Sequence, residues 1–240
     1  MSVPAAAPAF NCSSVTSGYG DSIVIRDVSI EINKGQIITV LGKNGMGKTT
    51  FLKTIMGFLK PTVGKIELFG EDVTGRDPQW LVERGVAYVP QEEAIFQDLT
   101  VEDNLRLGVR SDRYLKEGIA RIEPSFPVIT QRLRQKAGTL SGGEQKMLLM
   151  SRALMGRPKL LLIDEISEGL QPTMVLKIVE VLKKLSAEEN TSVLMAEQNI
   201  RLVNRISDEV ALINTGRIVE RRVLNDVGRN ESELIDLMRL

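Results

Sequence analysis

The sequence predicts an α/β fold with a mainly parallel core sheet, and three observations support this prediction. β-rich pieces dominate residues 22–69, where "SIVIRDVSIEI" alternates in places between apolar and polar residues. Helical patterns follow over residues 101–107, 141–155 and 172–185. Between these helices lie the continuous apolar runs "KLLLID" and "SVLMA", which are typical of strands buried on both faces of a parallel sheet.

The composition excludes several classes of protein. Lys and Arg together contribute 31 positive charges, and Asp and Glu together contribute 31 negative charges. Neither kind of charge is concentrated in one half of the sequence, so we expect no nucleic-acid partner. Cys12 is the only cysteine and there is no histidine, which excludes an internal disulfide and a zinc cluster. No stretch approaches the ~18 apolar residues of a membrane span, so we expect the chain itself to be soluble. We expect residues 1–9 to form a disordered tail and residues 10–240 one domain.

The strongest local signal lies in "TVLGKNGMGKTTFLKTIMGF", which follows G-x-x-x-x-G-K-[ST] between an apolar strand and a helix. Glycines let backbone N–H groups wrap the β- and γ-phosphates of a nucleotide, a lysine neutralises their charge, and a threonine hydroxyl can bind Mg²⁺. A chance match is the alternative, but the strand and helix on either side make it unfavourable. The predicted phosphate-binding residues are Gly42, Asn44, Gly45, Gly47, Lys48, Thr49 and Thr50.

A pair of carboxylates follows the apolar run of "KLLLIDEIS". Asp164 and Glu165 stand at the predicted carboxyl end of a buried strand, where α/β sheets present ligand-binding groups. Asp164 is predicted to hold Mg²⁺ through water, and Glu165 to polarise an attacking water. The alternative is an Asp-Glu pair that merely ends a strand at the surface, but the phosphate-binding loop favours the functional interpretation.

"TLSGGEQKMLLMSRAL", residues 139–154, resembles the signature motif of ABC-transporter ATPases in composition and in its place just ahead of "LLLIDE". A glycine-rich helix start with Ser141 as its N-cap is the local alternative, but it does not explain the order of the motifs. The resemblance covers about residues 10–220. It implies an ABC-type P-loop NTPase fold, in which an antiparallel β subdomain and a helical subdomain at about residues 92–140 accompany the core. It also implies that ATP and Mg²⁺ bind, and that two ATPase subunits sandwich two ATP molecules.

In such a dimer the signature segment of one subunit faces the γ-phosphate held by the other. The resemblance therefore assigns Ser141, Gly142, Gly143 and Gln145 to the nucleotide bound by the partner. A monomer would lack a complete site.

Two further positions match the pattern of the family. Tyr19 in "SGYG" resembles the aromatic residue that stacks on adenine, with an ordinary surface tyrosine as the alternative. Gln91 in "VAYVPQ" resembles the glutamine that reaches Mg²⁺ and connects the core to the helical subdomain, with an ordinary polar residue after a strand as the alternative. The implied metal set is Thr49, Gln91 and Asp164.

The segment "EEAIFQDLTVEDNL" would carry the surface that docks the transmembrane permease subunits. Ile95 and Phe96 are the candidate contacts, and packing in the core is an equally favoured interpretation of either side chain.

The apolar run "VLMA" breaks into Glu197, Gln198 and Asn199. In the wider family the corresponding strand ends in a histidine that contacts the γ-phosphate, and Gln198 takes this place here. A glutamine amide can donate a hydrogen bond but cannot carry the charge of a protonated imidazole. The resemblance therefore implies a catalytic set of Glu165, Gln198 and Lys48. The alternative is that Gln198 and Asn199 only start the helix "NIRLVNRI".

Departures from the general pattern indicate a subfamily. Ile166 stands where proline commonly follows the Asp-Glu pair, and Gln171 in "SEGLQP" stands where an aspartate is usual. Glu-Gln-Asn and "EGLQP" resemble ATPases of importers for branched-chain amino acids, urea and short amides, which a periplasmic solute-binding protein supplies. Such a subunit would lie at the cytoplasmic face of the inner membrane.

Several alternatives stay open. An ATPase of a lipid or glycolipid exporter shares most of these motifs, and a soluble ABC ATPase without a transport role is a further possibility. The second ATPase subunit could be another copy of this chain or a different chain. Residues 230–240 are predicted to form an N-capped helix of no assigned function.

Overall fold

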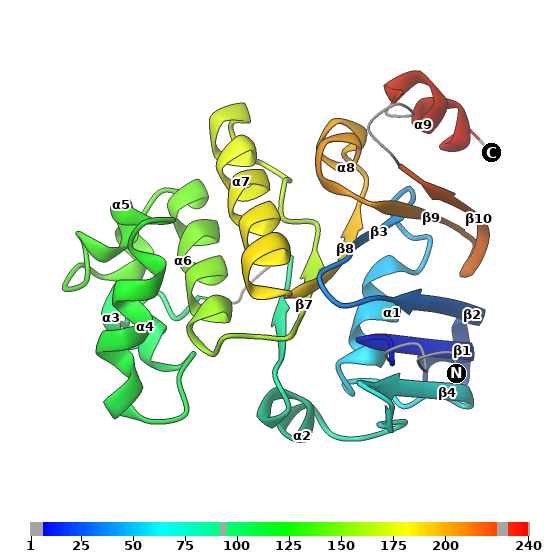
Figure 1. The fold of residues 1–240 in the computed structure, drawn as a ribbon, viewed down its shortest axis with the longest axis horizontal. Helices are drawn as coiled ribbons and strands as arrows, with labels where there is room; N and C mark the ends of the chain where they lie inside the picture. Colours follow the sequence, from blue (N-terminus) through cyan, green and yellow to red (C-terminus); the bar gives the residue numbers. More distant parts are fainter. Residues whose placement is uncertain (1–6, 92–94, 225–229, 240) are drawn as a thin grey trace, which may run out of the picture.

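The computed structural model describes residues 7–91, 95–224 and 230–239, and Figure 1 shows how its elements are arranged. The core sheet has the strand order β10-β9-β3-β8-β7-β6. Its strands are β3 (Ile37–Leu41), β6 (Val86–Val89), β7 (Leu160–Asp164), β8 (Ser192–Glu197), β9 (Glu209–Asn214) and β10 (Arg217–Val223). Neighbours from β9 to β6 run parallel, whereas β10 pairs antiparallel with β9. The prediction of a mainly parallel core sheet is confirmed.

The central strands are buried on both faces, which explains their continuous apolar sequences. In β7, Leu161 and Ile163 join the apolar cluster on one side of the sheet, while Leu160 and Leu162 join the cluster on the other side. Alternate side chains of a strand point to opposite faces, so every position of β7 must be apolar until the chain leaves the sheet. The first carboxylate, Asp164, stands where the strand ends.

A second, antiparallel sheet has the strand order β2-β1-β4-β5. Its strands are β1 (Phe10–Tyr19), β2 (Ser22–Ile32), β4 (Val63–Leu68) and β5 (Glu71–Asp72). Helix α1 (Lys48–Ile55) lies against both sheets and buries Phe51 and Leu52 in their common apolar cluster. The two sheets therefore both pack against α1.

The predicted tail needs one correction. Residues 1–6 lie outside the described residues, but Ala9 is fully buried, donates its N–H to the carbonyl of Ile32 and accepts from the N–H of Phe69. These bonds continue the pairing of β1 with β2 and β4, and a small apolar side chain fits beneath them. Ala9 thus belongs to the antiparallel sheet.

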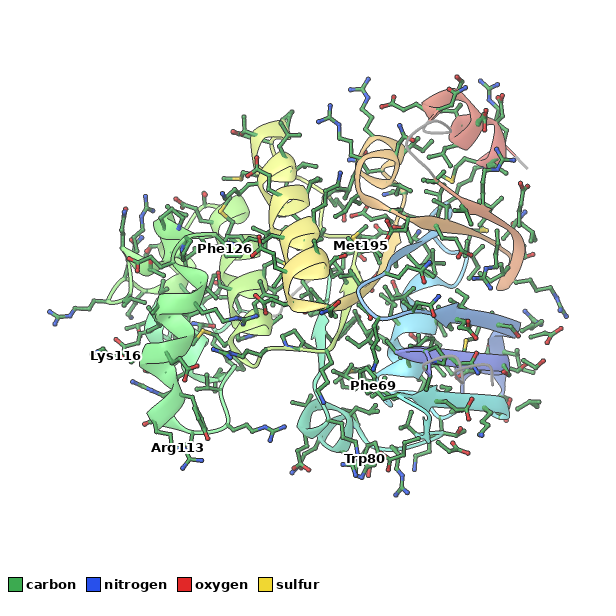
Figure 2. All side chains as sticks on the ribbon, in the orientation of Figure 1. Phe69, Trp80, Arg113, Lys116, Phe126 and Met195 are labelled. Carbon is green, nitrogen blue, oxygen red and sulfur yellow. The ribbon has the colours of Figure 1, made fainter. Side chains whose placement is uncertain are left out.

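The remaining helices are α2 (Pro78–Glu83), α3 (Val101–Arg106), α4 (Leu115–Ile122), α5 (Pro127–Thr130), α6 (Gly142–Met155), α7 (Pro172–Glu189), α8 (Ile200–Ile206) and α9 (Glu231–Leu237), with short 3₁₀ turns at Asp112–Tyr114 and Ala137–Thr139. Figure 1 shows α3, α4 and α5 gathered at one end of the molecule, with α6 and α7 between them and the strands. Phe126 and Met195, labelled in Figure 2, are both fully buried and belong to one apolar cluster that runs from these helices to β8. The helices within residues 92–140 are thus packed onto the core, while the boundary of the predicted subdomain stays a prediction, and its residues 92–94 lie outside the described residues.

Side chains cap the starts of three helices. Ser141 and Asn199, where the sequence predicts helix starts, each accept a backbone N–H in the first turn of α6 and α8, and Thr100 does the same for α3. Helix α7 begins at Pro172 as expected but continues to Glu189, where Asn190 ends it with φ of 54°.

Helix α9 packs against α8, where Leu234 and Leu237 join Val203 and Leu212 in a small apolar cluster. Among the described helices, none combines the length and the hydropathy that a membrane crossing requires.

Candidate active site

Residues 42–47 form the phosphate-binding loop between β3 and α1, and two glycines make its path possible. A Cβ on Gly42 would lie 2.7 Å from both the Cγ2 and the carbonyl oxygen of Ile213. Gly47 has φ of 102°, in the left-handed region that favours glycine, and precedes the first residue of α1. The loop therefore directs the N-terminal end of α1 toward the ligand space, where backbone N–H groups and the helix dipole favour an anion.

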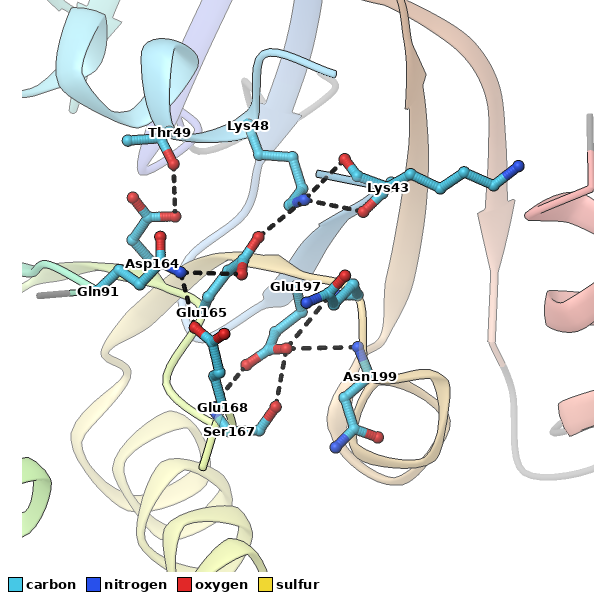
Figure 3. Close-up of polar contacts among 12 residues, drawn as sticks. Lys43, Lys48, Thr49, Gln91, Asp164, Glu165, Ser167, Glu168, Glu197 and Asn199 are labelled. Atoms are coloured by element: carbon cyan, nitrogen blue, oxygen red, sulfur yellow. Dashed lines mark hydrogen bonds and ion pairs between the residues drawn. The ribbon is translucent and has the colours of Figure 1, made fainter. Parts of the chain in front are cut away.

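Lys48 is the first residue of α1, and its side chain turns back over the loop. Its Nζ donates to the carbonyls of Gly42 at 2.8 Å and of Lys43 at 3.0 Å. The same Nζ lies 2.9 Å from Oε1 of Glu165, and both side chains are buried. Figure 3 shows Glu165 between Lys48 on one side and Gln91 on the other. The buried cation and the buried carboxylate thus neutralise each other beside the loop.

Glu165 follows β7 in an unusual backbone conformation, with φ of 44°. Its N–H donates to the carbonyl of Ala196 at 2.9 Å, which holds the residue against β8. The other oxygen of its carboxylate, Oε2, accepts from Nε2 of Gln91 at 3.3 Å. A left-handed conformation costs a non-glycine residue about 1 kcal/mol or more, and such residues cluster at functional sites. The backbone leaves the direction of β7 at this turn, and the carboxylate of Glu165 points back toward Lys48.

Asp164 lies one residue earlier, fully buried at the end of β7. Its Oδ1 accepts from the hydroxyl of Thr49 at 3.2 Å, and its Oδ2 accepts from the hydroxyl of Tyr88 at 3.3 Å. Burial raises the pKa of Asp164 above its ordinary value, the neighbouring Glu165 adds to the rise, and the hydrogen bond from Thr49 opposes it. Burial and the charge of Asp164 likewise raise the pKa of Tyr88, which keeps its proton. Burial thus opposes the charged form of Asp164, and a cation bound beside it would favour that form.

These donors fit Mg²⁺, which prefers oxygen ligands and is commonly bound by one or two protein groups together with substrate phosphates. Thr49 and Asp164 bring a hydroxyl and a carboxylate together, and Thr49 lines one cavity with Gln91, although Asp164 itself is not among the lining residues. The ion pairs of the described residues leave Asp164 without a cation, and Lys48 is committed to Glu165. Among the described residues, no group of three or more His, Cys, Asp or Glu side chains gathers as a metal cluster.

A cavity of about 260 Å³ opens above the loop. Its lining combines most of the predicted phosphate-binding residues with groups from three other segments: Val24, Asn44, Gly45, Gly47, Lys48, Thr49, Thr50, Gln91 and Glu165. The other predicted site residues, which are Tyr19, Gly42, Asp164, Gln198 and the signature residues of segment 141–145, are not among the lining residues of this cavity. Tyr19 is 47% exposed at the end of β1, and Gln198 is half-buried after β8.

The signature segment is fixed by its own hydrogen bonds and presents an open surface. Ser141 and Glu144 form a reciprocal capping box at the start of α6, and Nε2 of Gln145 donates to the carbonyl of Leu140 at 3.1 Å. Gly142 is exposed, and no atom lies within 4 Å of where its Cβ would be. Gly143, by contrast, lies so close to Met174 on α7 that a Cβ would meet the methionine sulfur at 2.3 Å. Among the described residues, the space beside Gly142 is therefore open.

Four residues of this region were not singled out by the sequence motifs. Tyr88 contacts Asp164, and Glu168 accepts from Nε2 of Gln91 at 2.7 Å. Lys146 on α6 donates to the carbonyls of Ile166 and Glu168, which connects the signature helix to the loop after Glu165. Ser167 bonds to the carboxylate of Glu197. The one available signal was proximity in the sequence, since each of the four lies within three residues of a predicted site residue.

The two departures from the family pattern have different surroundings. Ile166 is 1% exposed and fills the apolar cluster beneath α6 and α7, so an aliphatic side chain suits its position. Gln171 is exposed just before Pro172, and its side chain makes no capping bond to α7.

Of the two candidate docking residues, Ile95 packs against the core cluster, whereas Phe96 is 56% exposed.

Comparisons with known proteins agree with this geometry. The family described as "ABC transporter" matches residues 25–168. The "High-affinity branched-chain amino acid transport ATP-binding protein BraG" of Pseudomonas aeruginosa is 38% identical over 208 residues, which cover 85% of this chain and 88% of that protein. The "Probable branched-chain amino acid transport ATP-binding protein LivF" of Archaeoglobus fulgidus is 33% identical over 219 residues, which cover 90% of this chain and 93% of that protein.

Among solved structures, a nucleotide-free ATP-binding cassette from an ABC transporter superposes with a TM-score of 0.85 at 24% identity, and the match covers 97% of this chain and 96% of that one. That likeness supports the fold. The family match over most of the chain, together with relatives above 30% identity, establishes that the chain belongs to the ABC transporter family as one of its ATPase subunits.

Proposed function

We propose that this ATPase subunit powers the import of a small polar solute, such as a branched-chain amino acid, urea or a short amide. The observation that carries the proposal is the buried pair of Lys48 and Glu165 beside the phosphate-binding loop, because it places a phosphate-binding cation and a water-activating carboxylate on the same cavity. Similarity to BraG and LivF, which are named for branched-chain amino acid transport, supports the class of solute.

ATP enters with its phosphates on residues 42–50 and its adenine against Tyr19. The exposed face of Tyr19 leaves a ring available for stacking. The N–H groups at the start of α1 and the ammonium of Lys48 then bind the β- and γ-phosphates. Lys48 pairs with Glu165 in the structure, so a bound phosphate would replace Glu165 as the anionic partner of Lys48.

Thr49, Gln91 and Asp164 are the residues that would hold Mg²⁺. When bound, Mg²⁺ would neutralise charge on the phosphate oxygens. The raised pKa of Asp164 fits this role, since burial opposes the charged form of its carboxylate and a bound cation would favour it.

Hydrolysis requires that Glu165 be released from Lys48. Once the γ-phosphate has taken the ammonium, Oε1 of Glu165 is free to accept a hydrogen bond from water, while Gln91 still holds Oε2. Gln198 would orient the γ-phosphate or the water with its amide. Phosphoryl transfer depends mainly on positioning and on stabilisation of charge, and these groups supply both.

A second ATPase subunit completes the site. Ser141, Gly142, Gly143 and Gln145 do not line the cavity of their own subunit, and Gly142 faces open space. We place this segment against the γ-phosphate bound by the partner, where the N-terminal end of α6 favours an anion. Closing on ATP and reopening after hydrolysis would drive the permease subunits between two states, because ATP binds only the closed form tightly.

The permease subunits would dock beside the helical end of the molecule. Exposed apolar side chains occur there at Phe96, Leu99 and Leu107, with Val82 on the neighbouring α2. This arrangement would place the subunit at the cytoplasmic face of the inner membrane, with the periplasmic solute-binding protein on the other side.

Uptake measurements test the proposal. Cells that lack this chain are complemented with wild type or with Glu165→Gln, and the uptake of radiolabelled leucine, urea and acetamide is compared. We expect uptake of one of these solutes to require wild type, with no rescue by Glu165→Gln. Normal uptake of all three without the chain would contradict the proposal, and loss of lipid or glycolipid export in the same cells would favour the exporter alternative.

A further inference from the structure

Glu197 is the last residue of β8 and one of the most deeply buried carboxylates of the chain, with 1% of its surface exposed. Strand β8 lies between β3, which leads into the phosphate-binding loop, and β7, which leads to Asp164 and Glu165. Leu41 is the register partner of Glu197 on β3, and Asp164 is the partner of Ala196 on β7. The residue thus stands where three functional segments leave the core sheet side by side.

The carboxylate of Glu197 accepts four hydrogen bonds from two of these segments. Its Oε1 accepts from the N–H of Ser167 at 3.0 Å. Its Oε2 accepts from the hydroxyl of Ser167 at 3.0 Å, and from the N–H groups of Gln198 at 3.3 Å and of Asn199 at 3.4 Å. Figure 3 shows Glu197 between Ser167 and Asn199.

The backbone of Glu197 adds the third segment. Its carbonyl accepts from the N–H of Gly42 at 3.3 Å, at the first position of the phosphate-binding loop. One residue therefore contacts the loop that binds phosphate, the loop that follows the catalytic carboxylate and the turn that carries Gln198.

The chemistry of this contact requires a carboxylate. All four groups that face the side chain oxygens are hydrogen-bond donors, and an ionised carboxylate accepts with both oxygens. An amide would place its NH₂ either against the N–H of Ser167 or against the N–H groups of Gln198 and Asn199, and in both cases a donor would meet a donor. A buried donor left without an acceptor costs about 1–3 kcal/mol, so the loops would shift to avoid it.

We propose that Glu197 is a positioning residue for ATP hydrolysis, which holds the turn of Gln198 and the loop after Glu165 in a fixed relation to the phosphate-binding loop. It contacts neither phosphate nor water itself and acts through Ser167 and the backbone of residues 198 and 199. The inference rests on the proposed roles of Glu165 and Gln198.

The test compares Glu197→Gln with a matched control, Glu209→Gln. Glu209 is also a buried glutamate, 8% exposed, but it pairs with Arg221 at the start of β9, away from the cavity. For the purified chain we measure the ATP dissociation constant, kcat and Tm of both variants. We expect Glu197→Gln to lower kcat about tenfold or more, with the dissociation constant for ATP within about twofold of wild type, because displacing a catalytic group by about 1 Å costs about a hundredfold in rate. We expect Glu209→Gln to keep its kcat.

Ser167→Ala supplies a second, milder variant, because it removes the hydroxyl donor and keeps the N–H. If Ser167 and Glu197 act through one contact, the double variant should have a kcat no lower than Glu197→Gln alone, whereas independent effects would multiply. If Glu197→Gln does not fold, Ser167→Ala decides, and a kcat equal to wild type in that variant overturns the inference.

A kcat of Glu197→Gln equal to that of Glu209→Gln would overturn the inference and leave Glu197 a purely structural residue. Failure of the proposed transport function would look different, since it would alter solute uptake in cells and not the ATP turnover of the purified chain. A slow Glu197→Gln beside an unaffected Gln198→Ala would contradict the assigned role of Gln198, and Glu197 would then act through Ser167 and Glu165.

Discussion

Lys48 and Glu165 form a buried ion pair, with 2.9 Å between Nζ and Oε1 and no more than 5% of either side chain exposed. Lys48 also donates to two loop carbonyls, and Glu165 also accepts from Gln91. The cation and the carboxylate therefore neutralise each other. If Lys48 binds the phosphates of ATP as proposed, the negative charge of ATP would compete with Glu165 for Lys48, and ATP binding would be coupled to the release of this carboxylate.

Glu165→Gln should destabilise the nucleotide-free chain. Removing one partner of a buried ion pair costs about 3–5 kcal/mol, but Lys48 keeps two carbonyl acceptors, so we expect a loss of about 2 kcal/mol. Urea unfolding measures this loss. Glu168→Gln is the control, because Glu168 is exposed and bonds to Gln91 without contacting Lys48. Equal stability of the two variants would show that the ion pair contributes little. Saturating ATP should return part of the lost stability by mass action.

Gly142→Ala should lower the ATP turnover of the dimer without lowering the thermal stability of the subunit. No atom lies within 4 Å of the added methyl group, and Gly142 is the first residue of α6, so the substitution should leave Tm unchanged or slightly raised. If Gly142 approaches the nucleotide of the partner, the same methyl group should lower ATP turnover at least about tenfold, the loss that follows when a catalytic contact is displaced. Thermal unfolding and steady-state ATPase assays are made on one preparation. Full turnover in this variant would contradict the placement of the signature segment.

Asp164→Asn should change how stability depends on pH in the absence of Mg²⁺ and nucleotide. Burial raises the folded-state pKa of Asp164, so the folded chain binds this proton more tightly than the unfolded chain does. The stabilisation that the proton provides is complete below the ordinary pKa of about 3.9 and is lost as pH rises through the folded pKa. The unfolding free energy of Asp164→Asn minus that of wild type should therefore increase from about pH 4 upward and then level off. A difference that decreases with pH would mean that the carboxylate is stabilised in its ionised form.

Gln198→Ala should slow turnover more than it weakens ATP binding. Gln198 is half-buried after β8 and lies outside the cavity lining, so the bound phosphates should keep their contacts with the loop. Wild-type hydrolysis should also show no inflection near the ~6.5 of an imidazole between pH 6 and 8, because the chain has no histidine. Steady-state kinetics and equilibrium binding of ATP check both statements. Unchanged turnover in Gln198→Ala would end its assignment as a γ-phosphate contact.

The sequence predicts the parts of the site that lie within one continuous segment. The motif in residues 42–50 predicts a phosphate-binding loop without information from other segments. The end of an apolar run places Asp164 and Glu165 at the edge of the sheet. The cap of Asn199 and the start of α7 at Pro172 follow from local chemistry and are confirmed.

Contacts between segments could not be predicted in this way. The ion pair of Lys48 with Glu165 and the four bonds of Glu197 depend on β8 lying between β3 and β7, and nothing local to "VLMAEQNI" shows that Ser167 is its neighbour. Ala9 was missed for the same reason, since a short apolar residue after a proline has no local signal for its pairing with Ile32. These contacts follow from the order of the strands in the sheets. Long-range packing decides that order, and local sequence patterns do not show it.

The most direct test of the account is the molar mass of Glu165→Gln in solution, measured by light scattering with and without Mg-ATP. Removal of the carboxylate abolishes hydrolysis and frees Lys48 for the phosphate, so a closed dimer should accumulate. We predict that the mass doubles with Mg-ATP and returns to that of the monomer when ATP is removed. A mass that stays monomeric while ATP binds would contradict closure between two copies of this chain, and the second ATPase subunit would then be a different chain.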